Sequence, residues 1–123
     1  GREVPTNISP KRIELSREEA QQYVVMEHMT ANKGRTVEAE LAFVEVAPEL
    51  RTRLTAGNHP QEIFVKVDGR GNARGAFLDR ECKRAAGDAA IEELMTEMLF
   101  KPALNKGQPV DGVARVRWVE LAL

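Results

Sequence analysis

The sequence predicts an α+β fold, in which a small antiparallel sheet of three or four strands carries one long helix on a face. Two runs of alternating apolar residues, at 63–67 and 73–78, flank a glycine-rich turn and predict a β-hairpin. Apolar residues at helical spacing follow in 82–100, and a strand-like run closes the chain at 112–121. The order strand, strand, helix, strand is segregated along the chain, which is typical of α+β architecture.

The size and composition of the chain fit one folded domain. Its 123 residues are 42% hydrophobic and 30% charged, which is ordinary for a globular protein. We divide it into an N-terminal extension at 1–60, which packs on the core, and a C-terminal domain at 61–123. A net charge of −1 and a pI near 6.2 argue against a dedicated nucleic-acid binder, whose pI usually exceeds about 9.

The N-terminal extension begins with a lead-in and a predicted helix. Ser16 and Glu19 have the spacing of a capping box, so a helix is expected at about 17–30, and Asn-Lys-Gly at 32–34 ends it. The inner face of this helix is expected to hold Ala20, Tyr23, Val24 and Ala31.

A strand is predicted at 36–46, because apolar and polar residues alternate there. Its buried side is expected to hold Val37, Ala39, Leu41 and Phe43. Pro48 ends the strand, and a turn or short helix followed by a loop is expected at 47–60. This extension adds a helix and an extra strand alongside the main sheet.

The C-terminal domain holds the hairpin, the long helix and the last strand. The hairpin turns at 68–72 (Asp-Gly-Arg-Gly-Asn), and the helix at 82–100 places Glu92, Glu93 and Glu97 toward water. The core side of the helix is expected to hold Ala86, Ala89, Ala90, Ile91, Leu94, Met95 and Met98. In the last strand, the period of two puts Ala114, Val116 and Trp118 on one face and Val113, Arg115, Arg117 and Val119 on the other.

The residue types that usually carry catalysis or bind metals are sparse here. His28 and His59 have no Cys or carboxylate at metal-ligand spacing, so no metal or other cofactor is expected. Cys82 is the only cysteine and has no histidine nearby in sequence, so we expect no enzyme activity. A basic group near the predicted long helix is interpreted as ordinary surface charge, with an acidic partner or glycan as the alternative; it consists of Arg80, Lys83 and Arg84.

Several short motifs occur in an order that resembles a known family. They are Phe64-Val65-Lys66-Val67-Asp68 with Gly71, the alanines 86, 89 and 90, Phe100-Lys101-Pro102-Ala103 and Gly107-Gln108-Pro109-Val110, followed by the final strand. Together they resemble the C-terminal domain of TonB-type energy transducers over residues 61–121. The chain departs from that family at 58–60, where Asn-His-Pro replaces a Tyr-Pro, and at 79–82, where Asp-Arg-Glu-Cys replaces small residues.

The resemblance implies a function and a partner. Domains of this family are periplasmic binding modules that grip the N-terminal peptide of an outer-membrane receptor by strand addition and couple it to inner-membrane energy. The implied contact residues on the last strand are Val113, Arg115, Arg117, Val119 and Leu121. On this interpretation the targeting segment or anchor lies outside this sequence, and this chain itself contacts no membrane and no nucleic acid.

Two alternatives stay open at this stage. The chain is otherwise interpreted as an envelope scaffold or lipoprotein domain that uses the same fold without a motor partner. A free edge strand also allows a homodimer. If the N-terminal extension, which has no counterpart in the family, covers that edge, strand addition there is blocked.

Overall fold

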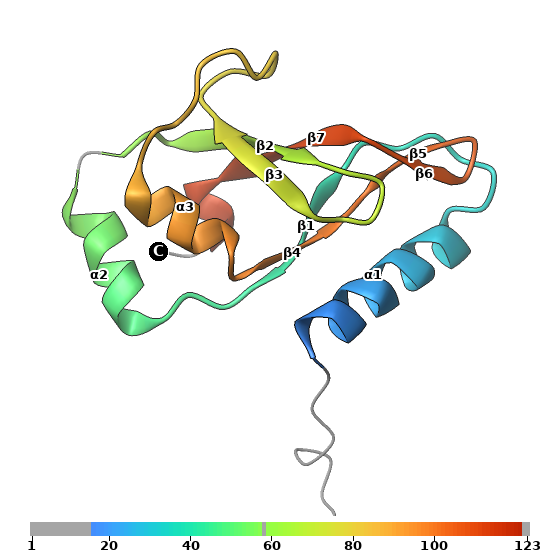
Figure 1. The fold of residues 1–123 in the computed structure, drawn as a ribbon, viewed down its shortest axis with the longest axis horizontal. Coiled ribbons are helices and arrows are strands. Elements are labelled where there is room, and N and C mark those ends of the chain that lie inside the picture. The colour runs from blue at the N-terminus through green and yellow to red at the C-terminus, as the bar shows by residue number, and fades with distance from the viewer. Residues whose placement is uncertain (1–15, 58, 122–123) are drawn as a thin grey trace, which may run out of the picture.

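The fold is a mixed α/β arrangement of three helices and several small antiparallel sheets, seen in a computed structural model that describes residues 16–57 and 59–121 (Figure 1). The expected α+β class is confirmed at this level. In chain order the elements are α1 (Arg17–Ala31), β1 (Glu40–Val44), α2 (Pro48–Ala56), β2 (Glu62–Val67), β3 (Ala73–Phe77), α3 (Ala89–Met95), β4 (Met98–Lys101), β5 (Ala103–Asn105), β6 (Gln108–Val110), β7 (Gly112–Arg117) and the 3₁₀ helix η3 (Trp118–Leu121).

The main sheet has the order β3-β2-β7, with β2 in the middle. The predicted hairpin forms its first two strands, and Gly71 takes the positive φ of 86° that the turn requires. β7 pairs antiparallel with β2, so that Val116 lies opposite Ile63 and Ala114 opposite Val65. These four side chains are fully buried, and they form the centre of the core.

The N-terminal half shares this core through β1. That strand pairs antiparallel with β4, and α2 packs on α3 at the other end of the molecule. One cluster of buried residues therefore draws members from both halves of the chain, among them Ala39, Leu50, Leu54, Ile63, Val65, Ile91, Leu94, Met98, Phe100 and Val116.

The prediction of a long helix at 82–100 is wrong in its extent. α3 covers only Ala89–Met95, because Cys82 and Gly87 have positive φ angles of 59° and 61°, and Asp88 caps the helix that follows. After the helix, Met98 and Phe100 are buried while Leu99 between them is half-buried, which is the alternation of a strand. β4 therefore forms where the last helical turn was expected.

Two predicted strands are shorter than expected. The strand at 36–46 reduces to β1, and a register shift between Leu41 and Phe43 turns the Phe43 side chain outward, where it is 54% exposed. The strand predicted at 112–121 ends at Arg117. The Trp118 N–H donates the last hydrogen bond of the ladder to the Gln61 carbonyl (3.0 Å), and the chain then enters η3.

The first helix forms where predicted, but it presents a different face. The capping box is confirmed, with Ser16 Oγ accepting from Glu19 N–H (3.1 Å) and Glu19 Oε1 accepting from Ser16 N–H (3.0 Å). The buried residues of α1 are Gln21 and His28, whereas Tyr23 is 57% exposed. Figure 1 shows the reason: α1 stands at the margin of the molecule and meets the edge of β4.

Polar side chains of α1 attach it to that edge. The Gln21 carboxamide donates to the Phe100 carbonyl (2.7 Å) and accepts from the Phe100 N–H (3.3 Å), as the backbone of a neighbouring strand would. Arg17 donates to the Met98 carbonyl (2.6 Å). A Cβ atom at position 71 would collide with the Gln21 amide. Glycine in the hairpin turn therefore leaves room for the Gln21 side chain.

We predict that Gln21→Leu lowers the free energy of unfolding by about 1–3 kcal/mol, because it leaves the buried N–H and C=O of Phe100 without partners. Urea denaturation of the whole chain measures this change. Gln22→Leu is the matched control on the exposed side of α1, and its effect should stay within about 0.5 kcal/mol. Equal effects of the two substitutions would contradict the role given to Gln21.

Candidate functional site

Some strand edges in the described part of the chain are covered, whereas β7, like β1 and β6, pairs with a strand on one side only. Residues 84–86 cover the outer edge of β3, since Leu78 N–H donates to the Arg84 carbonyl (2.8 Å) and Ala86 N–H to the Ala76 carbonyl (2.9 Å). α1 covers β4, as described above. Within residues 16–57 and 59–121, β7 pairs with β2 alone, and β1 lies beside its other edge without main-chain pairing to it.

The backbone groups on this edge can be identified from the register. Trp118 N–H bonds to Gln61, which makes every second residue of β7 face β2. The N–H and C=O groups of Val113, Arg115 and Arg117 therefore point away from the sheet. Their side chains lie on its outer face, and the predicted alternation of β7 is confirmed, because Ala114 and Val116 are fully buried.

A groove runs between this edge and β1. At one end of the groove Ala39 approaches Gly112, because a Cβ at position 112 would lie 3.7 Å from the Ala39 Cβ. Beyond that point lie two hollows of about 310 and 430 Å³. The hollows are lined by residues 37–44, Arg115, Arg117 and Glu120.

The two walls of the groove carry opposite charges. Glu38 and Glu40 lie on the β1 wall, and Arg115 and Arg117 on the β7 wall. A third hollow of about 490 Å³ continues past the narrow end, where Arg80 and Val113 line it together with apolar residues of β5 and β6. The groove thus follows the whole open edge of β7.

Three of the five predicted contact residues lie along this groove: Val113, Arg115 and Arg117. The other two, Val119 and Leu121, lie beyond the end of the strand in η3. Leu121 is buried in the core, and Val119 is 78% exposed. Sequence reasoning missed the lining residues at 37–44 and Glu120, among them Glu40 and Phe43. The alternation of residues 36–46 had placed Phe43 inside, and no sequence pattern marks Glu120.

Nearby charges hold both arginines in place. Arg115 Nε lies 2.6 Å from Glu62 Oε1 on β2, and Arg117 Nη2 lies 3.2 Å from Glu120 Oε2. On the same face of the sheet, the Arg80 guanidinium lies 5.2 Å from the Phe64 ring centre, a cation–π contact that covers this ring. The outer face beside the groove is therefore basic and aromatic.

Arg80 comes from a loop that one carboxylate organises. Asp79 accepts from the backbone N–H groups of Arg84 (2.8 Å) and Lys83 (3.0 Å), and the Arg84 bond is the main reason why the pKa of Asp79 is lowered. Burial raises the pKa of the Cys82 thiol in the same loop, which keeps the thiol protonated and weakly nucleophilic. Arg80, Lys83 and Arg84 are all exposed on this loop.

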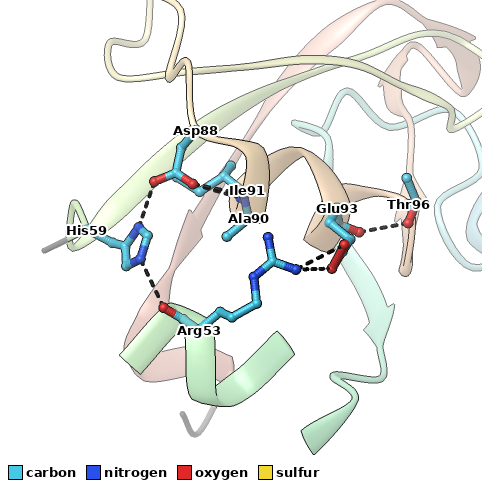
Figure 2. Close-up of polar contacts among 7 residues, drawn as sticks. All are labelled: Arg53, His59, Asp88, Ala90, Ile91, Glu93 and Thr96. Carbon is cyan, nitrogen blue, oxygen red and sulfur yellow. Dashed lines mark hydrogen bonds and ion pairs between the residues drawn. The ribbon is translucent and has the colours of Figure 1, made fainter. Parts of the chain in front are cut away.

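A second polar cluster joins α2 to α3 (Figure 2). His59 Nδ1 lies 2.7 Å from Asp88 Oδ2, and its Nε2 lies 3.3 Å from the Arg53 carbonyl. The other oxygen of Asp88 accepts from the N–H groups of Ala90 (2.9 Å) and Ile91 (3.4 Å), which caps α3. Both ring nitrogens of His59 thus face acceptors, and the ring holds the two helices together.

This cluster resembles a catalytic pair in composition, but its contacts are structural. Thr96, the hydroxyl residue in Figure 2, donates to the Glu93 carbonyl (2.7 Å), and Glu93 itself pairs with Arg53 (2.7 Å). The other histidine, His28, lies on α1 with Nδ1 3.2 Å from the Asn32 amide. In the described part of the chain, no three side chains of the metal-binding types gather into one group.

The pKa of Asp88 gives this cluster a measurable pH dependence. Burial raises that pKa, but the N–H groups of Ala90 and Ile91 and the His59 ring lower it by more, so it lies below the ordinary value of about 3.9. Ionised Asp88 therefore stabilises the fold above that value, and this contribution is lost as the pH falls through the lowered pKa.

We predict that the wild type loses more stability than Asp88→Asn between pH 5 and pH 2, both measured by urea denaturation. Asparagine remains a good N-cap but does not titrate, so it isolates the charge. Above about pH 5 the titration of Asp88 itself adds no pH dependence, because Asp88 is ionised in both the folded and the unfolded state. Curves that stay parallel down to pH 2 would contradict the assigned role of Asp88.

Comparison with known proteins adds no assignment. No known protein family, curated protein or solved structure matches this chain. Among the described helices, none combines the length and apolar character that crossing a bilayer requires.

Proposed function

We propose that this protein is a non-catalytic binding module that takes an extended peptide as an added strand along β7. The observation that carries the proposal is the open edge of that strand, whose outward N–H and C=O groups border a groove. Strand addition satisfies such groups through main-chain hydrogen bonds, while alternate side chains give specificity. The groove also offers the exposed ring of Phe43 at its wider part.

The partner class follows from the sequence resemblance to TonB-type domains. On that basis the peptide belongs to an outer-membrane receptor, and the protein works in the periplasm, anchored to the inner membrane or secreted. The final strand that carries the resemblance is also the strand with the open edge. An envelope scaffold without a motor partner is the alternative, and the experiment below separates the two.

We predict that a receptor-type peptide perturbs the backbone amide signals of residues 112–117 in an NMR titration of the labelled protein. Arg115→Pro should weaken binding about three- to tenfold, because proline lacks the outward N–H while the rungs to β2 stay intact. Arg115→Ala is the matched variant, since it removes only the side chain and keeps the N–H.

The two variants distinguish main-chain pairing from a side-chain contact. Equal weakening by both would show that the arginine side chain, and not the strand edge, binds the peptide. A flat response of the wild type at millimolar peptide would refute peptide capture and leave the scaffold alternative. Retained β2 and β3 amide signals in Arg115→Pro check that the sheet still folds.

A further inference from the structure

The open edge of β7 is partly occupied by the protein itself. Glu120 Oε1 accepts from the Arg117 backbone N–H (3.3 Å), and Oε2 lies 3.4 Å from Arg117 Nε and 3.2 Å from Nη2. One carboxylate thus contacts the outward backbone donor and the side chain of the same residue. η3 makes this possible, because it turns the chain back over the end of the strand.

We propose that Glu120 is an internal substitute for the partner, and that the site takes an extended peptide carrying a carboxylate side chain that displaces Glu120 from Arg117. This inference rests on the proposed function and specifies the ligand. In an added strand, a backbone carbonyl of the peptide must accept a hydrogen bond from the Arg117 N–H. Glu120 now accepts that hydrogen bond, so the peptide and the Glu120 carboxylate compete for the same donor. Displacement leaves the Arg117 guanidinium facing the new strand.

The contacts of Glu120 are weak enough to be replaced. Both side chains are about half exposed, 48% for Arg117 and 43% for Glu120, and exposed ion pairs contribute little to stability. The N–H to carboxylate distance of 3.3 Å also lies beyond the usual range for N–H···O bonds. By contrast, the Arg115 pair with Glu62 is short at 2.6 Å and joins two strands of one sheet.

The chemistry of the ligand follows from what Glu120 supplies. Opposite charges on adjacent strands stabilise each other, so an Asp or Glu beside Arg117 restores the lost ion pair. The peptide carbonyl meanwhile restores the hydrogen bond to the Arg117 N–H. A peptide with an uncharged residue at that position regains only the hydrogen bond and should bind more weakly.

The test uses two synthetic nine-residue peptides of alternating Thr and Val, one with a central Glu and the other with Gln at that place. Each is titrated by NMR into the wild type, Glu120→Ala and Glu92→Ala. Glu92, exposed on α3 and outside the groove, controls for the change in net charge. We expect Glu120→Ala to bind the Glu peptide about two- to tenfold more tightly than the wild type, and Glu92→Ala to bind it equally.

A measurement without ligand checks the contact itself. Hydrogen exchange at the Arg117 amide should be faster in Glu120→Ala than in the wild type, because the N–H then faces water. An unchanged exchange rate would overturn the proposal.

The binding outcomes separate this inference from the proposed function. Shifts along β7 with the same Kd in the wild type and Glu120→Ala would overturn displacement while leaving strand addition in place. Equal binding of the Glu and Gln peptides would overturn the carboxylate requirement. A flat response of all three proteins to both peptides would overturn strand addition and displacement together.

Discussion

The fold depends on satisfying the backbone N–H and C=O groups at the edges of several small sheets. A strand edge that is buried without partners is costly, and one that is exposed without partners is a site for association. The described residues, 16–57 and 59–121, form three separate sheets, so this chain has many strand edges for its size. The way each edge is closed decides which parts of the molecule are fixed and which remain available.

Three of these edges, those of β3, β4 and β7, are covered by different means. At β3 the main chain of residues 84–86 supplies the partners, in a loop that Asp79 organises. At β4 a buried carboxamide, Gln21, donates and accepts as a strand would. At β7 a half-exposed carboxylate, Glu120, accepts from one N–H and leaves the carbonyls of that edge untouched. Glu120 bonds to one backbone group of its edge, whereas two are bonded at β3 and three at β4, so of these three edges β7 is the one that a partner opens most easily.

Local signals in the sequence predicted the elements that depend on neighbours in the chain. The capping box at Ser16, the hairpin around Gly71 and the alternation from Gly112 to Arg117 each involve residues a few positions apart, and each is present in the structure. The long helix was wrong because Met98 and Phe100 fit both a helical and a strand period, and pairing with β1 decides between the two.

The missed parts of the site depend on contacts between distant segments. Gln21 and Phe100 are 79 positions apart, and nothing in an exposed-looking helix marks one glutamine as a buried partner. The groove likewise needs β1 beside β7, and a bulge after Leu41 turns Phe43 toward solvent. The sequence placed Val113, Arg115 and Arg117 on one strand face, but the wall opposite them comes from residues 37–44 in the N-terminal half of the chain.

That opposite wall changes what strand addition means for this protein. β1 pairs with β4 and lies beside the unpaired edge of β7, where Ala39 approaches Gly112. The groove between them has Arg115 and Arg117 on one side and Glu38 and Glu40 on the other. Because the side chains of an added strand point alternately to the two faces of the sheet, acidic residues suit the face on which the Arg115 and Arg117 side chains lie. If peptides bind as proposed, the N-terminal half restricts which ones fit, because a bare sheet edge would accept many sequences.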